Sequence, residues 1–323
     1  MSGGVYLDAY LAPLAPWLER DDVTDLMINR PGEVWIETAE GTISCEPAPE
    51  VTEQVLGRLA RQIAAASHQG VNREQPLLSA NLPDGARVQI VLPPATRDGL
   101  VLAVRKQVLS DFSLEQLDGA GLFAAHDAGA NAAAADDELQ ALLDAGRIAD
   151  FLKLAVKRRK TIVISGGAGA GKTTLLNALV KEIDPAERLI AIEDAPEIRL
   201  DRANAFGLVA VRGDQGEARV DADDLLRASL RLRPDRILLG ELRGAEAFAF
   251  LRMVNSGHPG SITTVHADSP DGALHQIALL ALTAGLELGW SQLMTYTEQV
   301  IDIVVQIERR DGRRAVTEIR FRR

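Results

Sequence analysis

Apolar positions follow two different patterns along the chain, and the change comes near its middle. In the first part, short apolar runs alternate with turn signals, as in VTDLMINRPGEVWIE (23–37) and LLSANLPDGARVQIVLPP (77–94). LVLAVRK (100–106) predicts another strand, and residues 51–68 carry apolar side chains at helical intervals. We therefore expect residues 1–123 to form a smaller amino-terminal α+β domain with a mostly antiparallel sheet.

In the second part, strands rich in valine, isoleucine and leucine alternate with helical stretches, a pattern typical of βαβ units and a parallel sheet. The last two apolar runs, VIDIVVQIE and AVTEIRF, flank a turn at residues 309–312 and predict an antiparallel hairpin. We expect residues 138–323 to form one α/β domain. The candidate strands are TIVIS (161–165), RLIAIE (188–193), DRILLGE (235–241) and SITTVH (261–266).

Between the two parts lies a segment of small and polar residues, HDAGANAAAADD (126–137). Its lack of bulky side chains favours a linker, which we place at residues 124–137. The alternative is an extension of the following helix, since alanine favours helix. In the linker interpretation, Asp136 or Asp137 would cap that helix.

The strongest chemical signal is GGAGAGKTT, which fits the phosphate-loop pattern GxxxxGK[ST]. The strand TIVIS precedes it and a helix follows it, as a phosphate-binding loop requires. We expect Lys172 to reach the β- and γ-phosphates of ATP and the Thr173 hydroxyl to hold Mg²⁺. The expected nucleotide-binding residues here are Gly166, Gly167, Ala168, Gly169, Ala170, Gly171, Lys172, Thr173 and Thr174.

Polar residues end three other candidate strands. RLIAIED ends in Glu193 and Asp194, DRILLGE in Glu241, and SITTVH in His266. Because ligands bind beyond the carboxyl ends of parallel strands, we expect Glu193, Glu241 and His266 to face the phosphates as catalytic residues. Taken singly, each is more often a cap or a hydrogen-bonded structural residue, so their combination with the phosphate loop carries this interpretation.

The two glutamates receive different expected roles. Glu241 stands where most phosphate-loop ATPases have aspartate, and its longer side chain favours contact with Mg²⁺ through water. Glu193 is then the favoured residue for polarising the attacking water. The roles could equally be exchanged, and the sequence leaves both assignments open.

The composition of the chain disfavours several classes of function and site. The formal net charge is −11 and aromatic residues make up 4% of the chain, which disfavours direct nucleic-acid binding. Cys45 is the single cysteine, so no internal disulfide or four-cysteine zinc motif can form. The first residues lack a basic leader followed by a long apolar run, and we expect no signal peptide. No stretch approaches the ~20 apolar residues that cross a bilayer.

Four ordered motifs resemble the secretion ATPase superfamily of type II and type IV secretion, pilus assembly and conjugation. They are GGAGAGKTT for Walker A, IAIEDAPEI for the aspartate box, LRPDRILLGELRGAEA for an atypical Walker B, and GHPGSITTVHADSP for the histidine box. In the amino-terminal half, VTDLMINRPGEVWIE and LPDGARVQIVLPPA look like the VirB-type ATPase, the eleventh component of type IV secretion. A RecA-like fold for the carboxyl-terminal domain is implied by this resemblance.

The resemblance also implies a homohexameric ring in which nucleotide binds between the two domains. Family arginines that approach the phosphates from the amino-terminal domain match Arg87 in GARVQ and Arg105 in AVRK. His266 matches the histidine that links the state of the γ-phosphate to neighbouring structure. The implied partners are other secretion components. The resemblance also implies that this protein is cytoplasmic and peripheral to the inner membrane. The linker decides whether an amino-terminal domain covers its own ATPase domain or a neighbour's.

Competing functions remain within the same superfamily and beyond it. The favoured one is an ATPase that hydrolyses ATP with Mg²⁺ to power type IV secretion. Alternatives are the ATPase of a conjugation or Tad-pilus system, and a DNA-handling ring motor. A non-enzymatic nucleotide-binding scaffold is disfavoured by the presence of Lys172, Thr173, Glu193 and Glu241.

Overall fold

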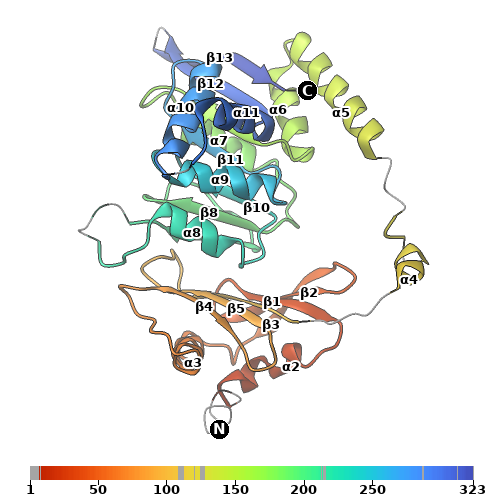
Figure 1. The fold of residues 1–323 in the computed structure, drawn as a ribbon, viewed down its shortest axis with the longest axis vertical. Helices are drawn as coiled ribbons and strands as arrows, with labels where there is room; N and C mark the ends of the chain where they lie inside the picture. The colour runs from red at the N-terminus through yellow and green to blue at the C-terminus, as the bar shows by residue number, and fades with distance from the viewer. Residues whose placement is uncertain are drawn as a thin grey trace.

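The structure, a computed structural model, describes residues 7, 9–107, 113–119, 121–123, 128–211, 213, 216–285, 287–310 and 312–322, with only the backbone of 128–135. Two sheets lie one above the other (Figure 1). The amino-terminal sheet, drawn in red to orange, lies below the carboxyl-terminal sheet, drawn in green to blue. No helix among the described residues is long and apolar enough to span a membrane.

The amino-terminal sheet is antiparallel throughout its described pairs. Its six strands lie in the order β3-β2-β1-β6-β5-β4. The bounds are β1 Val23–Ile28, β2 Gly32–Thr38, β3 Ile43–Ala48, β4 Leu77–Asn81, β5 Arg87–Val91 and β6 Val101–Arg105. This confirms the expected α+β domain with an antiparallel sheet.

One face of this sheet is covered by helix α3 (Glu53–Ala66). The helix begins where the Thr52 side chain accepts a hydrogen bond from the Val55 amide. Leu56, Leu59 and Ile63 recur along one side of α3 and are buried in the core of the sheet. The short elements η1 (Ala12–Leu14) and α2 (Ala15–Leu18) add Leu14 and Trp17 to the same core.

The carboxyl-terminal sheet has seven described strands in the order β13-β12-β7-β11-β10-β8-β9. Neighbours from β12 to β9 are parallel, and β12 pairs antiparallel with β13. The expected parallel strands and the final hairpin are therefore confirmed. The bounds are β7 Ile162–Ser165, β8 Leu189–Glu193, β9 Ala205–Val209, β10 Arg236–Leu239, β11 Ile262–Val265, β12 Ile303–Arg310 and β13 Arg313–Phe321.

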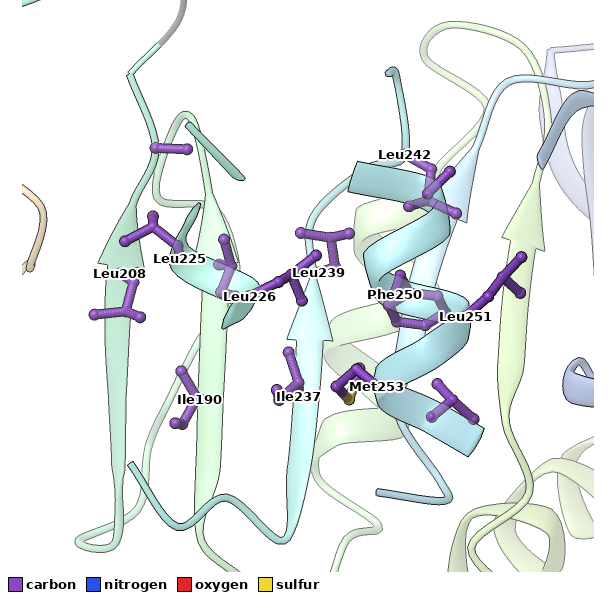
Figure 2. Close-up of a cluster of buried hydrophobic side chains, with 14 of the residues drawn as sticks. Ile190, Leu208, Leu225, Leu226, Ile237, Leu239, Leu242, Phe250, Leu251 and Met253 are labelled. Carbon is purple, nitrogen blue, oxygen red and sulfur yellow. The ribbon is translucent and has the colours of Figure 1, made fainter. Parts of the chain in front are cut away.

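Helices cover the faces of this sheet (Figure 1). Figure 2 shows the packing of α8 and α9 on the strands, with Leu226 near Leu239 and Phe250 and Met253 beyond Ile237. Burying one such aliphatic or aromatic side chain contributes about 1.5–3 kcal/mol, and this packing holds the carboxyl ends of the strands in fixed positions. The helices are α6 Ile148–Lys157, α7 Lys172–Val180, α8 Ala222–Ser229, α9 Glu246–Asn255, α10 Pro270–Leu282 and α11 Trp290–Val300.

In the chain between the two sheets stand α4 (Leu114–Gly119) and α5 (Ala128–Asp144), both on one side of the molecule (Figure 1). Residues 128–137 of the expected linker are helical, in accord with the alternative that alanine favours helix, and residues 124–127 lie outside the described part. Asp136 lies inside α5, where its Oδ1 pairs with Lys160 Nζ at 2.5 Å, so neither Asp136 nor Asp137 caps a helix here. The domain boundaries at 123 and 138 stay predictions.

Polar contacts join the two sheets at the edge near β9. The buried guanidinium of Arg188 donates to Asn29 Oδ1 at 2.6 Å and to Asn204 Oδ1 at 2.8 Å, and lies over the Phe206 ring. Complete burial lowers the pKa of Arg188. Arg233 pairs with Glu37 across the same interface. These contacts hold the amino-terminal sheet against the segments that precede β8, β9 and β10.

Candidate nucleotide-binding site

The phosphate loop connects β7 to α7. Gly166 and Gly171 have φ angles of +156° and +105°, in the region that favours glycine. At Gly166 a Cβ atom would lie 2.3 Å from the carbonyl oxygen of Ile307 on β12, so no larger residue fits beside that strand. The loop backbone is thereby directed to the amino end of α7, where unpaired N–H groups and the helix dipole favour an anion.

Lys172 lies folded over this loop. Its Nζ donates to the carbonyl oxygens of Gly166 and Gly167 at 2.9 and 3.2 Å and lies 3.3 Å from Nδ1 of His266. The lysine is only 8% exposed, and burial lowers the pKa of its ammonium group. Lys172 thus directly joins the phosphate loop to the histidine at the end of β11.

A cavity of about 460 Å³ opens above the loop, at the carboxyl ends of β7, β8, β10 and β11. Glu193, Glu241 and His266, which the sequence predicts to face the phosphates, all border it together with Lys172 and Thr173. Its other lining residues are Ala168, Gly169, Ala170, Gly171, Thr174, Asp194, Ala195, Glu197, Gly240, Arg243, Thr264 and Arg314. The fold therefore brings three distant polar strand ends to one phosphate loop.

Glu241 is the centre of a polar cluster in this cavity. Its Oε1 lies 2.6 Å from His266 Nε2, and its Oε2 accepts a hydrogen bond from Arg243 Nε at 2.6 Å. Arg243 also lies 3.7 Å from Asp194, and the bond to Glu241 raises the pKa of the Arg243 guanidinium. Through His266, Glu241 is connected to Lys172.

Glu193 is held differently. It is 4% exposed, and its Oε1 accepts hydrogen bonds from the backbone amides of Glu197 and Ile198, each at 2.9 Å. Its Oε2 is ion-paired with Arg97, which belongs to the amino-terminal sheet domain. Glu193 and Glu241 therefore each have an arginine partner, Arg97 from the amino-terminal domain and Arg243 from the carboxyl-terminal domain.

Arg87 and Arg105 lie elsewhere in the single chain. They are opposite each other on β5 and β6, both are exposed, and neither borders the cavity. Arg105 Nε lies 4.0 Å from Oδ1 of Asp25, whose pKa burial raises. Contact between these arginines and the phosphates stays a prediction that requires another copy of the chain.

Four charged residues at or near the cavity were not singled out from the sequence. Arg243 and Glu197 stand inside the Walker B and aspartate boxes, so the motifs themselves could have found them. Arg314 lies on the final hairpin, far along the chain from the phosphate loop, yet its Cδ would lie 2.8 Å from a Cβ atom at Gly171 in that loop. Arg97 follows Pro93-Pro94 in a loop without periodic signal, and only the docking of the domains brings it to the site.

The donor set fits a magnesium ion held mainly by phosphate. Among the described residues, no group of three or more His, Cys, Asp or Glu side chains is arranged to hold a metal. Mg²⁺ usually keeps several waters and binds one or two protein oxygens plus substrate phosphates. The Thr173 hydroxyl and Glu241 border the cavity and would provide such oxygens.

Comparisons with known proteins agree with this geometry. Residues 8–310 match the family described as "Type II/IV secretion system protein". The type IV secretion system protein PtlH of Bordetella pertussis is 43% identical over 98% of this chain and 95% of its own length. VirB11 of Bartonella quintana is 38% identical over 96% of this chain and 91% of its own length.

A solved structure extends the likeness to the whole fold. The crystal structure of the VirB11 ATPase from the Brucella suis type IV secretion system, in complex with sulphate, superposes with a TM-score of 0.91. It covers 99% of this chain and 95% of that chain, at 34% identity. This chain belongs to the type II/IV secretion system protein family.

Proposed function

We propose that this protein is an ATPase that hydrolyses ATP to ADP and phosphate to power type IV secretion. The observation that carries the proposal is the single cavity that gathers the phosphate loop, Lys172, Glu193, Glu241 and His266. ATP hydrolysis requires a phosphate cradle, a magnesium ion and an oriented water, and these residue types provide all three functions. The secretion role is supported by the relatives, each of which is described as a type IV secretion system protein.

Binding begins at the loop between β7 and α7. The backbone N–H groups at the start of α7 would surround the β-phosphate. Lys172 would leave the carbonyl oxygens of Gly166 and Gly167 and turn to the γ-phosphate, exchanging two neutral acceptors for an anion. When bound with the nucleotide, Mg²⁺ neutralises part of the charge that develops on the phosphates.

Glu241 and Glu193 would have different functions, one in binding the metal and the other in polarising the attacking water. Glu241 lies in reach of Lys172 through His266, so we place it beside the metal, with a water between carboxylate and ion. Glu193 would polarise the attacking water, as a carboxylate at the neighbouring strand end can. His266 contacts both Lys172 and Glu241, so its contacts would change when the γ-phosphate binds. This change would be transmitted to β11, which His266 follows in the chain.

The proposed assembly is a homohexameric ring at the cytoplasmic side of the inner membrane, working with other secretion components. Arg87 and Arg105, exposed at the same place on β5 and β6, would reach the phosphates of another copy in the ring. This pair adds two positive charges at the rim of a site that already contains several carboxylates. The ring would thereby complete the phosphate site from two subunits.

Ring assembly is tested by the mass of the protein in solution, with and without a slowly hydrolysed ATP analogue and Mg²⁺. We expect a species of six chains in the presence of the analogue. In the double variant Arg87→Ala/Arg105→Ala we expect a weaker shift toward this species, because nucleotide no longer bridges two copies. A protein that stays monomeric at high concentration with the analogue bound would contradict the proposed assembly.

A further inference from the structure

A short segment of the amino-terminal domain continues the carboxyl-terminal sheet. Residues 95–97 run antiparallel to β9, the last strand in the described order. The Val209 amide donates to the Ala95 carbonyl at 2.9 Å, and the Arg97 amide donates to the Gly207 carbonyl at 3.0 Å. Thr96 lies opposite Leu208 between these two bonds. The amino-terminal domain thus pairs directly with the strand next to β8, the strand that ends in Glu193.

From this segment the Arg97 side chain crosses β9 to reach the site. A Cβ atom at Gly207 would lie 2.2 Å from Arg97 Nε and 2.3 Å from its Cδ, so the missing side chain of Gly207 leaves the path open. Beyond β9, Arg97 Nη1 donates to the Ile198 carbonyl at 2.9 Å, and Nη2 is ion-paired with Glu193 Oε2. The side chains in this pair are 14% and 3% exposed.

In this arrangement neither carboxylate oxygen of Glu193 is free to bind a water molecule in the cavity. Oε1 accepts two backbone hydrogen bonds, and Oε2 is buried beneath the Arg97 guanidinium. A group that polarises an attacking water must lie in hydrogen-bond contact with that water. While segment 95–97 is paired with β9, Arg97 therefore occupies the position where Glu193 would meet water.

Arg97 and Glu193 belong to different domains, so their contact can be made or broken by a movement of one domain against the other. If segment 95–97 leaves β9, Arg97 moves away with the amino-terminal domain, while Glu193 stays at the end of β8. Burying the carboxylate without its partner is unfavourable, so Glu193 would turn toward the polar cavity it already borders. Domain position and the state of the carboxylate are then coupled.

We propose that Arg97 is a positioning residue through which the amino-terminal domain holds Glu193 out of reach of water until segment 95–97 leaves β9. The proposal rests on the proposed function, in which Glu193 polarises the attacking water. Because conformational steps of this kind often limit turnover, opening of the contact would set kcat.

Steady-state ATP hydrolysis of the full chain tests the proposal with two independent changes. Arg97→Ala removes the partner, and Gly207→Ala keeps both charges but blocks the path of Arg97 across β9. We expect kcat to rise by roughly three- to tenfold in both variants, with KM for ATP unchanged, because a step that opens the contact is removed. A lower or unchanged kcat in both variants would overturn the proposal.

A matched control removes an interdomain arginine away from the site. Arg73 pairs with Glu217 across the same two domains, with Nη2 and Oε2 2.7 Å apart, but its side chain is 63% exposed. Arg73→Ala should leave kcat and KM unchanged. An equal rise in this variant would show that general loosening of the domains, and not the contact with Glu193, changes turnover.

A reversible lock provides a second measurement. Thr96 and Leu208 form a non-hydrogen-bonded antiparallel pair, in which Cα atoms are about 4.5 Å apart and a disulfide can form. In Thr96→Cys/Leu208→Cys, with Cys45→Ser to remove the other thiol, oxidation should lower kcat at least about tenfold and reduction should restore it. Full turnover in the oxidised protein would overturn the proposal.

Glu193→Gln separates this inference from the proposed function. If this variant turns over ATP at the normal rate, the role assigned to Glu193 is wrong, whatever effect the Thr96→Cys/Leu208→Cys disulfide has on kcat. If it is inactive while the oxidised lock is fully active, the proposed function stands and the role of Arg97 is wrong.

Discussion

Lys172→Ala should reduce ATP turnover by at least about a thousandfold, since a single preorganised group that stabilises phosphoryl charge is worth several kcal/mol. In the structure the Lys172 ammonium contacts the Gly166 and Gly167 carbonyls and lies 3.3 Å from His266. It is the phosphate-loop cation that borders the cavity, and its burial away from water strengthens its attraction to an anion there. Alanine removes this charge and leaves the loop glycines intact.

Phosphate release from the purified protein measures this effect. Lys181→Ala is the matched control, because Lys181 is exposed at the end of the same helix and does not border the cavity. We expect Lys181→Ala to keep normal turnover. If Lys172→Ala kept normal turnover as well, the assignment of the phosphate site would be wrong.

Glu193→Gln and Glu241→Gln should both reduce kcat by about a hundredfold or more, but through different steps. Glutamine has nearly the same shape as glutamate but cannot polarise water as a base or carry charge next to a metal. Glu193→Gln should therefore leave nucleotide affinity and the Mg²⁺ requirement unchanged. Glu241→Gln should raise the Mg²⁺ concentration at half-maximal turnover, because Glu241 contacts His266, which in turn contacts the phosphate-loop residue Lys172.

A titration of turnover with Mg²⁺ at saturating ATP separates these effects, with nucleotide affinity measured in parallel. Glu182→Gln, near the carboxyl end of α7 and away from the cavity, is the control and should behave like the unchanged protein. If only Glu193→Gln altered the Mg²⁺ requirement, the two roles would have to be exchanged. That outcome would also remove the basis for an Arg97 contact that keeps water from Glu193.

The sequence predicted that Glu193, Glu241 and His266 lie together, because each stands at the end of a strand. TIVIS, RLIAIE, DRILLGE and SITTVH all contain strands of the parallel sheet, and parallel strands bring their carboxyl ends to one edge. The polar residue after each apolar run could therefore be placed without knowledge of long-range packing. Four ordered motifs then gave the family, which the comparisons confirm.

What could not be predicted depends on contacts between distant segments. The strand β9 (AFGLV) is short and follows a polar loop, so it has no periodic signal of its own. Arg97 stands 96 positions before Glu193 in the chain, and only the pairing of segment 95–97 with β9 brings it to the carboxylate. Arg314 reaches the phosphate loop because of the register between β12 and β13. Side-chain arrangements of this kind follow from tertiary packing, not from local pattern.

In residues 124–137, local composition left two interpretations open. Its small residues predicted a linker, with a helix extension as the alternative, and residues 128–137 belong to helix α5. Alanine has the highest helix propensity, so a segment between two domains can itself be helical. The expected contacts of Arg87 and Arg105 with phosphate stay predictions, because one chain does not bring these residues to its own cavity.

The most direct measurement is a structure of the full protein with Mg²⁺ and a slowly hydrolysed ATP analogue. We expect the γ-phosphate within hydrogen-bond distance of Lys172 Nζ, the metal on the Thr173 hydroxyl, and Glu193 and Glu241 on either side of the terminal phosphate. An analogue bound away from the loop between β7 and α7, or a γ-phosphate remote from both glutamates, would contradict the proposed hydrolysis site.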